Sequence, residues 1–289
     1  MEPGGGAPDR AAEAWRRAAL ARRRAEAAQD RARHYELLAA GSESGRVARL
    51  KAELAALQRR NAECHLSSAQ LQEAYARRAA QWRGNAPEPR FMTGVAEACG
   101  SRSAVLTVLG ADHGQLSFAA SDERAERAQE VEYLLEEGPG RDATLDRGPV
   151  RAAGSAIPER WPGYGPEVAG LGVAEVLAVP LLVGAECLGA LTVFDGLRQG
   201  SPRTAELVAE TLTRMVLLGP EAEPELYGGA EHQYVVQQAA GMVAVQARCE
   251  VADALAMLKA RAFAEGARIE AVADAVVRRT LRLGGADAT

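Results

Sequence analysis

No proline interrupts the sequence between Asp9 and Trp82, and alanine, arginine, glutamate, leucine and glutamine dominate this stretch. All five are strong helix formers, so this part of the chain is expected to be helical. Gly41 and Gly45 mark the one break. We therefore expect a disordered N-terminus over residues 1–8 and a helical region over 9–83, with two helices at about 9–40 and 46–83.

The second predicted helix has apolar residues at coiled-coil spacing. Leucines and a valine alternate at three and four residues, and an asparagine falls at one of the inward positions. A single inward asparagine favours a two-stranded coiled coil of fixed register. The candidate dimer seam is Val47, Leu50, Leu54, Leu57 and Asn61. We interpret it as a homodimeric coiled coil, with a parallel pairing favoured and an antiparallel one open. The alternative is a hairpin in which the two helices of one chain pack together.

Charge divides the chain into three regions of different character. Residues 1–83 carry a formal charge of +6, residues 84–224 carry −10, and residues 225–289 carry −1. The boundaries agree with the change in hydrophobic pattern, so we expect a multidomain protein of α and α+β parts.

Short apolar runs separated by turn residues replace the helical pattern after Pro87 and Pro89. Strands are expected at 104–109, 115–121, 176–183 and 187–194. The last two flank the short turn Gly184–Glu186, which is typical of a hairpin. Helices are expected at 123–136, with Ser121 or Asp122 as its N-cap, and at 202–218. Residues 88–218 are thus predicted to form an α+β sandwich with an antiparallel sheet.

Two stretches in this region resemble the GAF sensor domain, in the variant found in actinobacterial regulators. They read QEVEYLLEEGPGRDA and RWPGYGPEVAGLGVAEVLAVPLLVGAECLGALTVF. The resemblance implies a cytosolic domain that senses a small ligand or supports dimerisation, and it does not identify a ligand. Pockets in this family lie between the sheet and the adjacent helices. The candidate pocket residues are Phe118, Trp161, Tyr164 and Cys187, and ordinary core packing is the alternative for each.

A Pro/Gly/Glu-rich linker at residues 219–230 leads to three amphipathic segments within residues 231–283, and 284–289 form a tail. The apolar stripes are Val235, Ala239, Met242 and Val243, then Val251, Ala254, Leu255, Leu258 and Ala262, then Ile269, Val272, Ala273, Val276 and Val277. Gly266 separates the second segment from the third. This pattern predicts a small three-helix bundle.

The segment QQAAGMVAVQARCEVADALAMLKARAFAEGARIEAVADAVVRR, within residues 231–282, resembles the ANTAR domain. That family is an RNA-binding module of transcription antitermination regulators. The resemblance implies that the bundle recognises RNA with two small stem-loops. The candidate RNA-binding residues are Gln237, Gln238, Ala239, Gly241, Arg261, Arg268, Arg278 and Arg279. Ala239 and Gly241 would let the backbone approach RNA, with close helix packing as the alternative explanation.

Other functions find little support in the sequence. The chain has four histidines and four widely separated cysteines, with no CxxC pair, GxSxG, HExxH or GxxxxGK[ST] motif. We therefore expect no enzyme, metal site, disulfide framework or evident cofactor. The start, MEPGGGAPDR, lacks the apolar stretch of a secretory signal, and no apolar run approaches the length of about 18 residues that a membrane helix needs. A cytoplasmic location without membrane contact is expected.

Two functions fit these observations. In the first, a cytoplasmic homodimer senses a small ligand and binds paired stem-loop RNA in leader transcripts to control termination. In the second, the chain is a protein-interaction regulator whose bundle no longer binds RNA. The second is favoured by the near-neutral charge of the C-terminal region and by Ala240, which stands where many ANTAR sequences have lysine.

Overall fold

A computed structural model describes residues 7–84, 89–110, 114–196, 202–214 and 230–283 of the chain. The expected tail at 284–289 lies outside these residues, as do residues 1–6 of the expected disordered N-terminus and 219–229 of the expected linker. The chain divides into two compact units. One comprises Met1–Ser101 with Leu197–Ala222, and the other Arg102–Gly196 with Glu223–Thr289.

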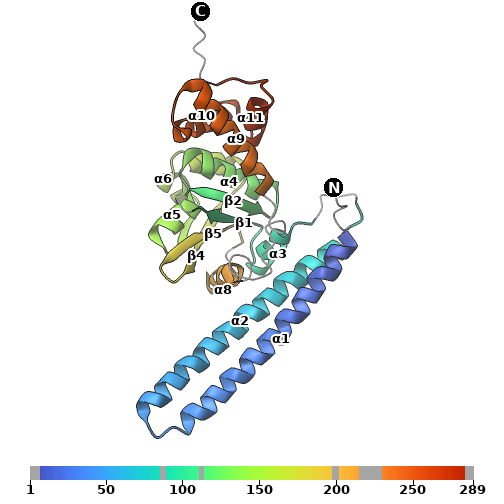
Figure 1. Cartoon of the computed structure of the whole chain (residues 1–289), viewed down its shortest axis with the longest axis vertical. Helices are drawn as coiled ribbons and strands as arrows, with labels where there is room; N and C mark the ends of the chain where they lie inside the picture. The colour runs from blue at the N-terminus through green and yellow to red at the C-terminus, as the bar shows by residue number, and fades with distance from the viewer. Residues whose placement is uncertain (1–6, 85–88, 111–113, 197–201, 215–229, 284–289) are drawn as a thin grey trace, which may run out of the picture. The chain divides into compact units, whose positions relative to one another are not determined.

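The first unit consists of helices. Its members are α1 (Ala7–Ala40), α2 (Gly45–Gln81), α3 (Phe91–Ala98) and α8 (Pro202–Leu212). Helices α1 and α2 fold back on one another as a long hairpin (Figure 1). Their bounds agree closely with the prediction from helix-forming residues and the glycine break. The helices α3 and α8 begin and end the region predicted as the sheet domain, but they group with α1 and α2.

Alanines hold the hairpin together. Those of α1 recur every three or four residues and are buried. They are Ala11, Ala14, Ala18, Ala21, Ala25, Ala28 and Ala32. The buried alanines of α2 include Ala55, Ala62, Ala69 and Ala76. Small side chains allow two helices to approach closely, and a side chain of α1, Arg22, reaches across to Glu73 of α2 at 2.6 Å.

The predicted seam of α2 is not what joins the two helices. Val47, Leu50 and Leu57 are 42%, 57% and 49% exposed, and Leu54 is half-buried. Asn61, expected at a dimer seam, instead accepts a hydrogen bond from Nη1 of Arg214, beyond α8, at 2.5 Å. The within-chain hairpin is therefore the arrangement present, because the alanine stripe packs more closely than the leucine stripe. Contact between the exposed leucines and a second chain stays a prediction.

The second unit contains a five-stranded antiparallel sheet in the order β2-β1-β5-β4-β3. The strands are β1 (Ser103–Leu109), β2 (Gln115–Ala120), β3 (Val150–Ala153), β4 (Glu175–Val183) and β5 (Glu186–Phe194). All four strands expected from the sequence are present, and the antiparallel α+β fold is confirmed. The short edge strand β3 was not expected, since four residues give too little alternation to recognise.

Strands β1 and β5 approach closely at Gly189. This residue has a φ of 152°, and a Cβ atom there would lie 1.9 Å from the carbonyl oxygen of Thr107. Only glycine fits such a position. The close approach brings the central strands together beneath four helices of this unit, α4 (Glu123–Leu135), α5 (Pro139–Asp146), α6 (Ala156–Arg160) and α7 (Tyr164–Gly170).

The C-terminal part of the second unit is a bundle of α9 (Ala230–Ala247), α10 (Val251–Glu265) and α11 (Ile269–Val277). Gly266, with a φ of 59°, ends α10 as the sequence indicates. The three predicted apolar stripes meet in one core, centred on Val243, Leu258 and Val272. Within the part of the chain that the structure describes, every helix is too short or too polar to cross a bilayer.

Candidate functional site

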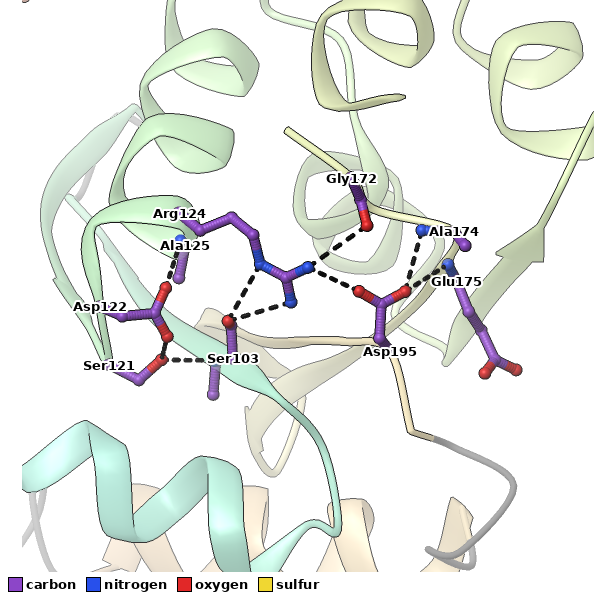
Figure 2. A network of polar contacts seen from close by, with 10 residues as sticks. Ser103, Ser121, Asp122, Arg124, Ala125, Gly172, Ala174, Glu175 and Asp195 are labelled. Carbon is purple, nitrogen blue, oxygen red and sulfur yellow. Dashed lines mark hydrogen bonds and ion pairs between the residues drawn. The ribbon is translucent and has the colours of Figure 1, made fainter. Parts of the chain in front are cut away.

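The helix α4 is fixed to the sheet at its first turn. Asp122 caps the helix by accepting a hydrogen bond from the amide of Ala125 at 3.0 Å, as one of the two caps expected. Ser121 donates to the other oxygen of Asp122 at 2.5 Å and accepts from the amide of Ala104 at 2.9 Å. The end of β2 and the start of β1 are thereby joined to the start of α4 (Figure 2).

Arg124 extends this connection to the two other central strands (Figure 2). Its Nη1 donates to Oδ2 of Asp195 at 2.7 Å, and its Nη2 donates to Oγ of Ser103 at 3.1 Å. The other oxygen of Asp195 accepts from the amides of Ala174 and Glu175, at 2.9 and 3.0 Å. Residues at the ends of β1, β4 and β5 thus set the position of α4 through one guanidinium group.

The opposite face of α4 contacts the bundle. Glu126, Glu130, Tyr133 and Leu134 follow the spacing of one helix face. Tyr133 and Leu134 pack against the apolar core of the bundle, whereas Ala125 and Ala128 of the same helix pack in the core of the sheet domain. The helix therefore lies between the two cores.

Arg268, which precedes α11, is held among carboxylates. It forms an ion pair with Glu126, its Nε lies 2.8 Å from Oε1 of Glu130, and Glu270 lies 3.6 Å away. The Glu130 side chain is 3% exposed. Burial raises the pKa of Glu130, and the neighbouring Arg268 and Arg127 oppose that shift. The second cation, Arg127, donates to Glu130 at 2.8 Å.

Lys259 of α10 makes the second polar contact, with Glu136, the residue that follows α4. Its Nζ donates to Oε1 of Glu136 at 2.8 Å and lies 4.1 Å from the centre of the Tyr133 ring. The hydrogen bond from Lys259 lowers the pKa of Glu136, and burial raises the pKa of Tyr133 to about 12. The lysine is thus desolvated, paired and stacked on an aromatic ring.

The predicted RNA-binding residues with polar side chains are either exposed or in contact with α4. Gln237, Gln238, Arg261, Arg278 and Arg279 are exposed. Of these, Arg261 pairs with Glu265, and Arg278 pairs with Asp274 at 2.7 Å. Arg268 faces α4, as described above. The exposed positions leave these side chains open to a partner.

The two small residues of the RNA-binding prediction differ from each other. Ala239 is fully buried in the bundle core, so its side chain serves the helix packing that was the alternative explanation. At Gly241 a Cβ atom would meet nothing within 4 Å, so its backbone is not at a close helix contact. Ala240 is also fully buried in the bundle core.

Three of the four predicted pocket residues come together. Trp161 and Tyr164 are buried in the sheet-domain core, with their rings 6.1 Å apart in an edge-to-face contact, and Phe118 packs against the same core. The indole of Trp161 donates to Asp142 at 3.2 Å. Cys187 is not in that cluster. It lies beside the β4–β5 turn, and its thiol donates to the carbonyl of Gly189 at 3.4 Å.

A buried polar group adjoins these aromatic residues and was not predicted. Glu132 of α4 accepts from the amide of Arg141 at 2.5 Å through Oε1. Its Oε2, the hydroxyl of Tyr164 and the hydroxyl of Thr192 are buried without a hydrogen-bond partner in the described chain. Burial raises the pKa of Glu132 to about 7. Polar atoms left in this way favour a bound water or small ligand.

The sequence offered little sign of the glutamates in α4, because acidic residues in a short helix are normally solvated. Their helical spacing was the one available signal. Among the described residues, no group of three or more histidine, cysteine, aspartate or glutamate side chains is arranged to hold a metal ion.

Comparison with known proteins finds a distant structural match. No protein-family model matches the chain, and no curated protein matches it. The chain is similar to the crystal structure of the GAF domain from Acinetobacter phosphoenolpyruvate-protein phosphotransferase, at 15% identity and a TM-score of 0.29. That match covers 64% of this chain and 97% of the other.

Proposed function

We propose that this protein is a cytoplasmic, signal-responsive regulator that binds stem-loop RNA through the α9–α11 bundle and thereby controls transcription termination. The sheet domain senses a small ligand or supports a homodimer, and the protein acts by binding without catalysis. The observation that carries the proposal is the bundle itself. Its three helices have a core of their own, and the amide and guanidinium donors expected to meet RNA lie outside that core.

The chemistry of RNA recognition suits these exposed side chains. Unpaired loop bases are read by hydrogen bonds and close contact, and phosphates are bound by arginine or lysine. Gln237 and Gln238 are exposed amides on one helix, and Arg278 and Arg279 are exposed guanidinium groups at the end of another. Open space at Gly241 supports a close approach of the ligand to the backbone of α9.

The sensing role is supported by the polar group of Glu132, Tyr164 and Thr192. Side-chain oxygens of Glu132 and Thr192 lie together beside Gly140. Tyr164, whose hydroxyl also lacks a hydrogen-bond partner among the residues that the structure describes, belongs to the same core cluster as Trp161. A small molecule with both a donor and an apolar body would meet these groups. Such a ligand shifts the protein between two states only as far as its affinity for them differs.

The test measures binding of the full chain to a paired stem-loop RNA. Fluorescence anisotropy gives the affinity at low and at moderate salt. An unstructured RNA and a duplex DNA of equal length are the comparison ligands. We expect binding that is confined to the stem-loop RNA and weakens as salt rises, because phosphate contacts release counterions. Equal binding to all three ligands, or to none, would contradict direct RNA recognition.

A pair of charge-matched variants locates the contact. Arg278→Ala with Arg279→Ala should weaken RNA binding roughly tenfold or more and lower its salt dependence, because each arginine that binds a phosphate adds to both. Arg46→Ala with Arg49→Ala removes two exposed arginines from α2 and should leave the affinity unchanged. If both pairs of substitutions weaken binding equally, the effect is one of net charge alone.

One observation favours the second candidate, a protein-interaction regulator. Lys259 and Arg268, two cations of the bundle, are engaged by protein carboxylates of α4. If the bundle binds protein surfaces in general, the full chain should fail to bind any of the three nucleic acids, and the Arg278→Ala/Arg279→Ala variant should lose a protein partner instead.

A further inference from the structure

Glu126, Glu130 and Glu136 are called the α4 carboxylates here. They form ion pairs with two cations of the bundle that would otherwise be available to RNA. Glu126 and Glu130 hold Arg268, and Glu136 holds Lys259. Arg268 is one of the residues that the sequence nominates for RNA contact. Lys259 belongs to the same bundle and is the least exposed of its paired cations, with 11% of its side chain accessible.

Carboxylates and phosphates compete for the same donors. Both are anions that accept charge-assisted hydrogen bonds from guanidinium and ammonium groups, with similar distances. The other paired cations of the bundle differ, because Arg261 and Arg278 pair with a carboxylate one turn away on their own helix. Such exposed pairs are weak and exchange easily. The pairs with α4 instead join two separate parts of the unit.

The contact with α4 is reinforced by apolar packing. Tyr133 and Leu134 pack against the bundle core beside the two ion pairs, and Arg127 donates to the carbonyl of Gly266 at 3.4 Å. A contact with an apolar centre and ion pairs around it excludes a large ligand from the surface that it covers. RNA and α4 therefore cannot hold Lys259 and Arg268 at the same time.

From this geometry we infer that the α4 carboxylates form an internal competitor for RNA, and that the structure is the closed state of an autoinhibited regulator. The inference rests on the proposed RNA-binding function and adds its means of control. Opening the contact between α4 and the bundle frees Lys259 and Arg268 for phosphate, and binding of RNA favours the open state by the same amount of free energy.

The position of α4 connects this contact to the sheet domain. Its first turn is fixed by Arg124 and Asp195 to the ends of the central strands, and Glu132, in the middle of the buried polar group, belongs to the same helix. A ligand that bonds to Glu132 would act on the element that carries Glu126 and Glu130.

The first experiment removes the competing charge without touching the RNA-binding residues. Glu126→Gln with Glu130→Gln in the full chain should tighten binding of stem-loop RNA by roughly five- to a hundredfold, the usual range for coupled sites. The matched control is Glu123→Gln with Glu159→Gln, which removes two exposed carboxylates from the same domain. The control variant should bind RNA as the parent does.

The outcomes separate this inference from the proposed function. Tighter binding by the α4 variant alone, with unchanged binding by the control, supports the competitor. Equal binding by parent, variant and control would overturn the competitor and leave RNA binding intact. Equal tightening in both variants would show a net-charge effect and also overturn it. If none of the three proteins binds RNA, the proposed function fails, and the inference fails with it.

A second measurement needs no substitution. Hydrogen exchange of the unaltered chain is followed with and without stem-loop RNA. We expect RNA to speed exchange of the amides of α4, residues 123–135, because the helix loses its packing on the bundle, while exchange in the bundle slows. Bound RNA that leaves exchange in α4 unchanged would show that the contact stays closed, and the inference would be wrong.

Discussion

The guanidinium group of Arg268 lies 2.8 Å from the carboxylate of Glu130, a side chain of which 3% is exposed. This pair joins α11 to α4. The buried charge of Glu130 is balanced by Arg268 from the bundle and by Arg127 from its own helix. A buried charge that loses a partner costs far more than the pair contributes while intact. The two residues should therefore respond unequally to substitution.

We expect Arg268→Gln to lower the free energy of unfolding by about 1–3 kcal/mol, the cost of leaving a charged group poorly paired. Glu130→Gln should cost less, because it removes the desolvated charge itself. The double variant should recover most of the loss seen in Arg268→Gln. Urea denaturation followed by near-ultraviolet circular dichroism measures all three. Strict additivity of the two single effects would show that the pair does not couple.

Stability should fall as pH rises through the range in which Glu132 ionises. Its pKa is raised from an ordinary value of 4.5 to about 7, so the folded protein keeps a proton that the unfolded chain has released. The stabilisation is complete below pH 4.5 and is lost by about pH 7, with a magnitude of about 3 kcal/mol for a shift of this size. Above that pH this group adds no further change.

Glu132→Gln tests the assignment, because glutamine does not titrate. The free energy of unfolding is measured by urea denaturation between pH 5 and pH 8 for both proteins. The difference between parent and variant should change with pH and level off above about pH 7. A constant difference over this range would mean that Glu132 is ionised at pH 5 in the folded protein.

The alanine stripe of the hairpin should tolerate no larger side chain. Ala25 is fully buried between α1 and α2, and Ala27, two residues away on the same helix, is exposed. Ala25→Leu should lower the free energy of unfolding by about 1–3 kcal/mol through overpacking, and Ala27→Leu should change it little. Thermal unfolding followed at 222 nm compares the two variants. Equal stability of the two variants would show that Ala25 does not pack against α2.

Much of the fold was predictable because its signals are local. The break at Gly41–Gly45, the cap at Asp122 and the stop at Gly266 depend on residues within one turn of the chain, and the structure has all three. The short apolar runs of β1, β4 and β5 and the alternation in β2 likewise predict strands from local sequence. Four residues were too few to reveal β3.

The choice of packing face was harder to predict, because it depends on segments distant in the sequence. In α2 the leucine stripe is the stronger pattern, yet the buried stripe is the one that matches the alanines of α1. The sequence predicts that Arg268 contacts RNA, and nothing near it in sequence indicates that Glu126 and Glu130 face it. Its position follows from how two amphipathic elements pack, which local periodicity does not encode.

The leucine stripe of α2 leads to the last prediction, which concerns assembly. Leu50 is 57% exposed in the single chain, so Leu50→Glu should leave the stability of the monomer almost unchanged. If the seam of Val47, Leu50, Leu54 and Leu57 joins two copies, the same substitution buries a carboxylate in the dimer and should dissociate it. Leu145→Glu, at a position that is 68% exposed in the sheet domain, is the control.

Analytical ultracentrifugation over a range of concentrations distinguishes the possibilities. We expect a dimer for the parent and for Leu145→Glu, and a monomer for Leu50→Glu. A dimer that survives Leu50→Glu would place the interface elsewhere, and a monomeric parent would exclude the homodimer. The RNA assay gives an independent check, since two linked bundles raise the effective concentration at a second stem-loop. Leu50→Glu should then weaken binding to RNA with two stem-loops and leave binding to RNA with one stem-loop unchanged.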